Sequence, residues 1–351
     1  MEEKSISFFL RHLWAWFCLV QLTLVWQVQA QSTEPEPSLT ERISQGWSYQ
    51  LRVVGFGMVT EVADTPRNPD NLIMALPQHT AGLQVRPDLR LDVARLSLSL
   101  QPRAEWYWES WDQGPEADEA QGRSETFIHQ WLVRLRCTDA LYVSYGRENL
   151  QWGPAYLTSL SNPFFEDNGK SNPKLEVAAM DFARMVWVPS LTWSVSLIAD
   201  TDQGRQDIPD AVFEETYALK TDYTGSADYG SLILAYSETA LDQISGFYGR
   251  TLSDAALVYA EGVLQRNPPG RYPQGTDDPL GFAMSAKDRS DDTWIGSLSS
   301  GVAYTLASGP TLTLEYLYYG PGYDDDEAQA FFDLQARAAG EIQAGTALTP
   351  L

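Results

Sequence analysis

From Trp47 to Tyr319 the chain alternates apolar and polar residues with a period of two, in one short segment after another. The clearest example is 81–92, where one parity carries Leu83, Val85, Leu89 and Leu91. Successive side chains of a strand point to opposite faces, so each such segment predicts a strand with one apolar and one polar face. The sequence therefore predicts an all-β protein, with strands at 47–62, 80–91, 96–108, 125–136, 141–149, 175–188, 191–199, 213–223, 230–239, 242–251, 255–265, 294–306 and 311–319.

Two architectures use such strands, a soluble β-sandwich and an outer-membrane barrel. The connections distinguish them, because tight turns alternate with long polar loops at 63–79, 109–124, 150–174, 200–212, 266–293 and 320–340. Aromatic residues such as Trp106, Trp108 and Tyr318 stand at strand ends next to the long loops. This pattern is typical of an up-and-down antiparallel transmembrane β-barrel, for which we expect about 14–18 strands.

The N-terminus has the composition of an export signal. Lys4 and Arg11 precede an apolar stretch, 13–25, that leads to a small residue at Ala30. We interpret residues 1–30 as a cleaved signal peptide, with a membrane anchor as the alternative. Residues 31–46 then form a polar periplasmic leader, and 47–351 form the barrel domain.

The C-terminus predicts an unfinished barrel. Residues 325–340 have the composition of a helical insertion in a loop, and the chain stops at Leu351 without the closing aromatic residue that such barrels usually carry. Thirteen strands is an odd number, whereas single-chain bacterial barrels use even numbers. We therefore expect that the barrel domain is C-terminally truncated and that closure needs further strands, since an unpaired edge in lipid is costly.

Charge and composition exclude several functions. The formal charge of −23 lacks the basic surface that nucleic-acid binding requires. Beyond the signal peptide the chain has only two histidines, His79 and His129, and one cysteine, Cys137, so it lacks a multi-histidine metal site and an obvious Cys-His pair. The sequence predicts no enzyme, no metal and no cofactor.

The polar faces of the early strands carry a strip of cations. Its members are Arg86, Arg90, Arg103, Arg134 and Arg136, interspersed with Asp88, Asp92 and Glu105. Guanidinium groups bind carboxylates and phosphates in a fork, so the strip can attract an anionic solute into a channel. The alternative, that these arginines pair with the wall carboxylates, stays open.

The stretch 146–154, Gly-Arg-Glu-Asn-Leu-Gln-Trp-Gly-Pro, resembles a motif of Gram-negative outer-membrane barrels of the porin, alginate-export and capsule-assembly kind. The stretches 246–250 and 314–320 are similar in character. The resemblance implies that Arg147 and Trp152 line the lumen and that the following loop folds inward as a constriction. Trp152 as an interfacial anchor is the structural alternative.

These observations predict a channel in the cell outer membrane. It would pass small solutes or export an anionic polysaccharide. Its expected partners are outer-membrane lipid and lipopolysaccharide, the barrel-assembly machinery and an anionic solute or polysaccharide. A secreted, soluble, β-rich carbohydrate-binding or hydrolytic protein is the alternative of another class.

Overall fold

The computed structural model describes residues 38–65, 68–170, 176–206, 213–237, 242–266, 271–275, 282–286 and 293–344. The predicted signal peptide and residues 31–37 of the leader lie outside these residues. The last residues of the leader form helix α2 (Leu39–Gly46). Its start is a capping box, because the Ser38 backbone N–H donates to Glu41 Oε2 (2.7 Å) and the Glu41 N–H donates to Ser38 Oγ (3.3 Å). The chain divides into two compact units, 1–42 and 43–351, and the second is described below.

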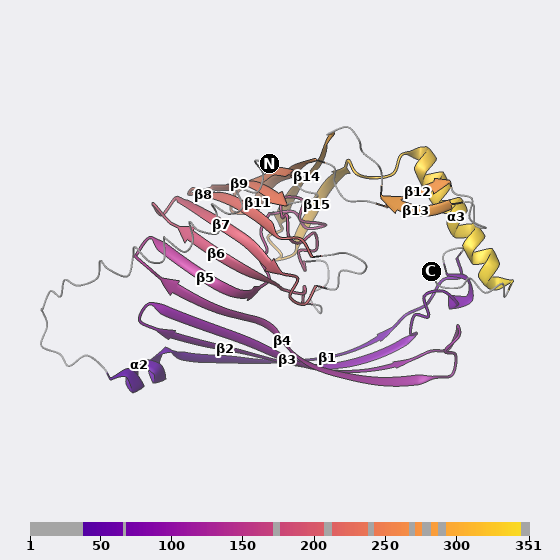
Figure 1. Ribbon diagram of the computed structural model, residues 1–351, viewed down its shortest axis with the longest axis horizontal. Helices are drawn as coiled ribbons and strands as arrows, with labels where there is room; N and C mark the ends of the chain where they lie inside the picture. The colour runs from indigo at the N-terminus through magenta and orange to yellow at the C-terminus, as the bar shows by residue number, and fades with distance from the viewer. Residues whose placement is uncertain are drawn as a thin grey trace, which may run out of the picture. The chain divides into compact units, whose positions relative to one another are not determined.

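One antiparallel sheet of thirteen strands dominates the second unit, and its strands follow one another in chain order (Figure 1). The strands are β1 (Trp47–Val59), β2 (His79–Val93), β3 (Leu96–Ser110), β4 (Ala120–Arg136), β5 (Leu141–Glu148), β6 (Met180–Trp187), β7 (Trp193–Asp202), β8 (Thr216–Thr224), β9 (Asp228–Ser237), β10 (Asp242–Ser253), β11 (Ala256–Arg266), β14 (Trp294–Thr305) and β15 (Thr311–Tyr319). Each of the thirteen predicted segments overlaps one strand, although β4 begins at Ala120, inside the segment 109–124 that was predicted as a loop. The predicted fold class, all-β with up-and-down antiparallel strands, is confirmed.

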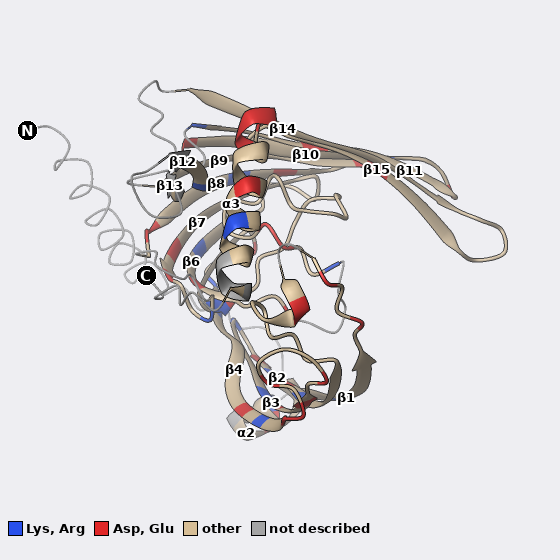
Figure 2. Cartoon of the chain, turned by 90° about the vertical axis from the view of Figure 1, so that its right-hand side faces the viewer, with Lys and Arg blue, Asp and Glu red and all other residues tan. Residues whose placement is uncertain are grey.

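The two faces of this sheet have opposite polarity. Fully buried side chains on the strands include Arg103, Gln84, Gln243 and Glu261, whereas many large apolar side chains on the other face are exposed. We call the face that carries Arg103 and Glu261 the inner face, and the apolar one the outward face. In Figure 2, charged segments recur along β2, β3, β4, β6 and β7, while β10, β11, β14 and β15 are mostly uncharged.

The connections alternate between short turns and long loops, with the one exception that the sequence also showed, the short connection between β9 and β10. The short ones join β2 to β3, β4 to β5, β6 to β7, β8 to β9, β10 to β11 and β14 to β15. The long connection after β11 contains a separate hairpin, β12 (Arg271–Gly275) and β13 (Phe282–Ala286), where the sequence predicted only a polar loop. The segment predicted as a helical insertion lies in helix α3 (Asp325–Gln343).

The sheet has two edge strands, β1 and β15. Among the described residues these two strands do not pair with each other. Register shifts interrupt the pairing at three places in the sheet, and at one of them Gln101 pairs with Gln130 but Pro102 pairs with Ile128. The bulged residue is His129, and the shift turns Phe127 to the face of its partner Arg103.

Candidate functional site

The loop between β5 and β6 folds against the inner face, on the concave side of the sheet in Figure 1. Its side chains Leu150 and Phe165 are buried in one apolar cluster with strand residues of β6 to β9, namely Met180, Phe182, Ile198, Ala218, Ile233 and Ala235. Apolar burial of this kind stabilises a docked loop by about 1.5–3 kcal/mol per large side chain. The inner face is therefore occupied by a packed segment of the chain itself.

Glu261 on β11 is the main polar anchor of this loop. Its side chain is 1% exposed. Oε1 accepts hydrogen bonds from the Ser161 backbone N–H (2.8 Å), the Ser161 hydroxyl (2.7 Å) and the Ser159 hydroxyl (3.3 Å). Oε2 accepts a bond from the Ala155 N–H (3.2 Å). A buried carboxylate is costly unless it is hydrogen-bonded, and here the loop supplies the donors.

Gly153 explains part of the motif that precedes these contacts. It has φ +86°, a conformation that L side chains rarely adopt, and a Cβ at this position would lie 2.5 Å from Glu261 Oε2. Only glycine allows the backbone to approach the carboxylate so closely without strain. The Gly-Pro pair at 153–154 thus serves the docking of the loop.

A second carboxylate, Glu315 on β15, holds the adjacent backbone. Its oxygens accept hydrogen bonds from the N–H groups of Tyr156 (2.7 Å) and Leu157 (3.0 Å). The Tyr259 hydroxyl donates to the same carboxylate (2.7 Å). Glu261 and Glu315 together fix the loop along β11 and β15.

The loop is also bonded within itself. The Lys170 ammonium donates to three backbone carbonyl oxygens, those of Gly153 (3.0 Å), Pro154 (3.3 Å) and Ala155 (2.8 Å). Burial lowers the pKa of Lys170, and the nearby carboxylates of Glu261 and Glu315 oppose that shift. Lys170 therefore ties the end of the loop to the segment that contacts Glu261.

Across the sheet, three arginines gather around one carboxylate. Glu176 precedes β6 and accepts two hydrogen bonds from Arg103. Arg103 Nε donates to Oε2 (2.6 Å), and Arg103 Nη2 donates to Oε1 (2.9 Å). Arg86 Nε lies 3.7 Å and Arg52 Nη2 lies 3.9 Å from the same carboxylate. Burial acts to raise the pKa of Glu176, but the hydrogen bond from Arg103 and the surrounding positive charges hold that pKa below its usual value. The predicted residues Arg86 and Arg103 are thus brought together.

Arg134 lies apart from this group, on β4. Its positive charge attracts the carboxylates of Asp92 and Glu148 and repels the Arg184 guanidinium. Arg184 donates to Glu148 Oε2 (3.2 Å), so β4, β5 and β6 share a second charged cluster.

The remaining members of the predicted strip lie elsewhere. Arg90 is exposed and pairs with Asp92 (2.7 Å), and Arg136 reaches the Ala94 carbonyl at the β2–β3 turn (3.5 Å). Glu105 accepts a hydrogen bond from the Tyr107 hydroxyl (3.1 Å). These three residues do not join the cluster around Glu176.

Arg147 and Trp152 come from the motif region. Arg147 is directly opposite Trp131 in the β4–β5 register, and Trp131 packs on the exposed Tyr145 of the outward face. This register differs from the lumen-lining position expected for Arg147, and the side chain forms an ion pair with Asp181 (2.7 Å). Trp152, in contrast, packs against the inner-face cluster, edge-on to Phe164.

Sequence reasoning missed three cations of the inner face. Arg52 lies near the carboxylate of Glu176, and Arg184 forms an ion pair with Glu148. Lys220 pairs with Asp222, and its ammonium lies 5.2 Å from the centroid of the Trp152 ring. The alternation of apolar and polar residues along β1, β6 and β8 was the signal that could have placed these three cations on the inner face. Glu261 was also missed, although it is a lone acid between Tyr259 and Val263 on an otherwise uncharged face of β11.

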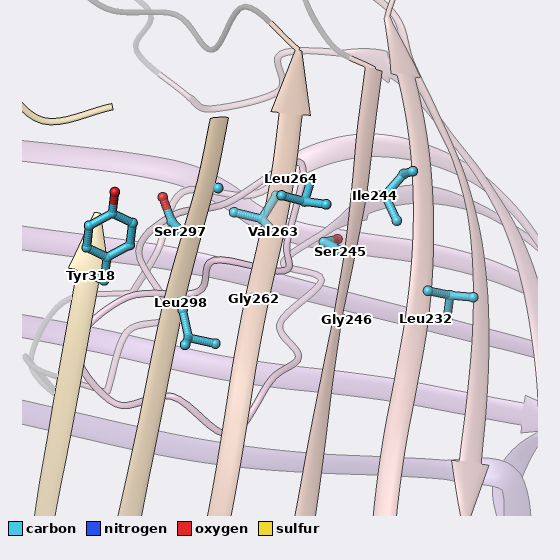
Figure 3. Close-up of a pocket in the computed structure, with 11 residues that line it drawn as sticks. Leu232, Ile244, Ser245, Gly246, Gly262, Val263, Leu264, Ser297, Leu298 and Tyr318 are labelled. Carbon is cyan, nitrogen blue, oxygen red and sulfur yellow. The ribbon is translucent and has the colours of Figure 1, made fainter. Parts of the chain in front are cut away.

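An apolar depression lies on the opposite side of the sheet (Figure 3). Its floor includes Gly246, Gly262 and Gly296 on three adjacent strands. Exposed side chains of the outward face flank it, namely Leu232, Ile244, Leu264, Leu298 and Tyr318. This depression is therefore separate from the charged inner face.

The described residues contain no group of three or more His, Cys, Asp or Glu side chains placed to hold a metal ion. No helix among the described residues combines the length and the apolar composition needed to cross a bilayer.

Comparison with known proteins gives similarity at the level of solved structures. No protein-family model and no curated protein sequence matches the chain. It is similar to the crystal structure of OprD from Pseudomonas aeruginosa, with 12% sequence identity and a TM-score of 0.43 over 78% of this chain. It is also similar to the crystal structure of a double variant of OccD1 (OprD), with 12% identity and a TM-score of 0.31, covering 72% of this chain and 74% of that one. The chain spans 58% of the length of the first of these proteins.

Proposed function

We propose that the chain forms a porin-like channel in the outer membrane, through which small solutes pass along the inner face. The observation that carries this proposal is the inverted polarity of the sheet. Charged and amide side chains are buried on the inner face, while large apolar side chains are exposed on the outward face. Soluble monomers rarely expose contiguous apolar surface beyond a few hundred Å². A bilayer covers such a surface.

The height of the apolar band supports this environment. On β14, the exposed aromatic residues Trp294 and Tyr304 are ten residues apart and lie near opposite ends of the strand. Ten residues at about 3.3 Å each span about 33 Å, and a tilt of about 40° reduces this to about 25 Å across the membrane. That height matches the band between the aromatic girdles of outer-membrane barrels.

The soluble alternative fits these observations less well. A secreted β-sandwich would bury its apolar faces against each other and leave the charged faces in water. Here Arg103 and Glu261 are buried while residues such as Leu314 (74% exposed) and Leu234 face outward. A soluble protein would need a second layer over the outward face, and no such layer lies among the described strands and helices.

The chemistry of the inner face supports an anionic solute. Outside the cluster around Glu176, the inner face carries three further cations, Arg134, Arg184 and Lys220, and guanidinium groups suit carboxylate and phosphate. The docked loop fills part of the inner face. Because the loop narrows the space along the inner face, small solutes are better supported as the transported molecules than an exported polysaccharide.

The proposal includes the expected partners. Lipid acyl chains and lipopolysaccharide would cover the outward face, and the barrel-assembly machinery would insert the chain. The acidic long loops would face the aqueous side.

Conductance of the purified, detergent-folded protein in planar bilayers tests the proposal. In a KCl gradient, the triple variant Arg134→Gln, Arg184→Gln, Lys220→Gln should lower the chloride-to-potassium permeability ratio about twofold or more, because three inner-face cations are lost. The control is Arg250→Gln, which removes an exposed arginine on β10. Absence of conductance in the wild type refutes the channel, and an unchanged ratio in the triple variant refutes the anion preference.

A further inference from the structure

The apolar depression on the outward face lies near the end of the sheet where the long loops attach. Gly296 on its floor follows Trp294 by two residues, and β14 begins at Trp294 after the long connection from β11. Two residues of strand are about 7 Å. Long loops are extracellular in barrels of this kind, and aromatic residues mark the membrane surface. The depression therefore lies in the outer-leaflet half of the apolar band.

The floor of the depression is bare backbone, and large apolar side chains stand around it (Figure 3). Gly246 and Gly262 are directly opposite each other across β10 and β11. Gly296 lies on the next strand, two residues before Leu298, the partner of Gly262. The volume of the depression, about 530 Å³, is within the roughly 300–1,000 Å³ of small-molecule pockets. An apolar group can therefore reach the backbone of three strands.

The packing of the strands explains the glycine at 246 but not the one at 262. A Cβ on Gly246 would lie 2.5 Å from the Ser231 carbonyl oxygen, so β9 leaves no room for it. A Cβ on Gly262 would meet its nearest atoms at 3.4 and 3.5 Å, which is ordinary contact, and Gly262 is not among the residues with positive φ. Glycine weakens a strand and often marks the close approach of a ligand. Close approach of a bound group therefore accounts for Gly262, whereas the described packing does not require it.

A charged pair stands at the loop end of the depression. On β11, Arg266 follows Leu264 by two residues, and on β10, Asp242 precedes Ile244 by two. Alternate residues of a strand share a face, so both charged side chains lie on the outward face. Arg266 Nη2 lies 2.5 Å from Asp242 Oδ2, and the Arg266 side chain is 40% exposed. Asp242 thus orients a guanidinium whose five N–H donors suffice for a phosphate as well.

We propose that the depression binds one acyl chain of lipopolysaccharide, with a phosphate group of the same molecule at Arg266. The inference rests on the proposed function, since it requires the outward face to lie in the outer membrane. Inside a bilayer an apolar chain gains nothing by leaving water, so one lipid is preferred only through van der Waals packing and its headgroup. The bare backbone at Gly262 supplies the packing, and the guanidinium supplies the headgroup contact. Lipopolysaccharide fits both because it is the phosphate-bearing lipid of the outer leaflet.

Binding of fluorescently labelled lipid A, the membrane part of lipopolysaccharide, to the detergent-folded chain tests the apolar part of the site. Gly262→Val fills the floor with a β-branched side chain that strands favour. Its affinity for lipid A should fall on the order of tenfold, the usual cost of overfilling a packed site, and Gly262→Ala should show a smaller loss. The matched control is Gly57→Val, the same change on the outward face of β1, where a Cβ meets nothing within 4 Å.

The headgroup contact is tested with lipid A and with its dephosphorylated form. Arg266→Gln should lower the affinity for lipid A on the order of tenfold and leave the affinity for the dephosphorylated form unchanged. Arg250→Gln, which removes an exposed arginine at the other end of β10, is the control. Heat-modifiability gels establish that each variant is folded. Equal lipid A affinity in the wild type and in both Gly262 variants, or phosphatidylethanolamine bound as tightly as lipid A, overturns the proposal.

A second copy of the chain is the competing occupant. A wild-type oligomer that Gly262→Val dissociates, with lipid A affinity unchanged, would make the depression a contact between copies and the proposal wrong. Conductance is measured separately. A wild type that conducts but does not bind lipid A refutes the lipid site alone, and a chain that binds lipid A as expected but does not conduct refutes the channel alone.

Discussion

Glu261→Gln should release the loop from the inner face. The carboxylate accepts four hydrogen bonds from the loop, and the two from Ser161 are the shortest, at 2.7 and 2.8 Å. Hydrogen bonds to a charged group are worth about 1.5–3 kcal/mol each, so these two contribute about 3–6 kcal/mol to docking. The amide has the same size and keeps one acceptor oxygen, but it places an N–H group against one set of loop donors.

About half of that free energy is therefore lost, about 2–3 kcal/mol, because the remaining oxygen still accepts hydrogen bonds. At 1.4 kcal/mol per factor of ten, the equilibrium between docked and released loop shifts about thirtyfold or more. The apolar cluster around Phe165 and Phe182 opposes full release. We expect a channel that alternates between the wild-type conductance and a larger one.

Single-channel recording detects this change, and limited proteolysis of the loop in detergent detects it independently. Glu105→Gln is the control, since Glu105 is also an inner-face glutamate but its hydrogen bond comes from Tyr107 and not from the loop. A Glu261→Gln protein with wild-type conductance and wild-type protease resistance would refute the assignment of Glu261 as the anchor of the loop.

Three other substitutions or conditions test the remaining features. Gly153→Ala should loosen the loop more than Gly309→Ala loosens its turn; both pay about 1–2 kcal/mol for positive φ, but only Gly153 also meets Glu261, and proteolysis compares them. Leu298→Arg, within the apolar band, should cost about 2–4 kcal/mol and lower the yield of folded protein on heat-modifiability gels, whereas Leu191→Arg at a fully exposed turn should be neutral. The Glu176 contribution to stability should persist at the usual glutamate pKa and fade as the pH falls through its lowered pKa, so the thermal stabilities of wild type and Glu176→Gln should converge only below the usual glutamate pKa.

The strands could be predicted because their signal is local. Alternation such as that of Leu83, Val85 and Leu89 needs only neighbouring residues and a sheet with two unlike faces. The same rule fails wherever the pairing is irregular. The bulge at His129 moves Phe127 to the other face, and the segment 176–179 leaves the sheet before β6 begins at Met180.

The partners of the predicted arginines could not be predicted in the same way. Parity places Arg86 and Arg103 on one face, but it does not reveal that a carboxylate 73 residues later lies between them. That contact depends on the path of a loop, which has no periodicity. Of the two alternatives for the cationic strip, pairing with carboxylates of the chain is present at Arg103, and attraction of an anionic solute stays a prediction.

The buried polar face and the docked loop depend on each other. Glu261 is 1% exposed, and a buried carboxylate without donors would cost several kcal/mol. The strands cannot supply these donors, because their backbone N–H groups are used in the sheet ladder. The loop backbone around Ser161 has N–H groups free of any ladder, and glycine at 153 lets it approach. The loop therefore stabilises the inner face by the same contacts that narrow it, and a substitution that widens the channel at Glu261 should also destabilise the protein.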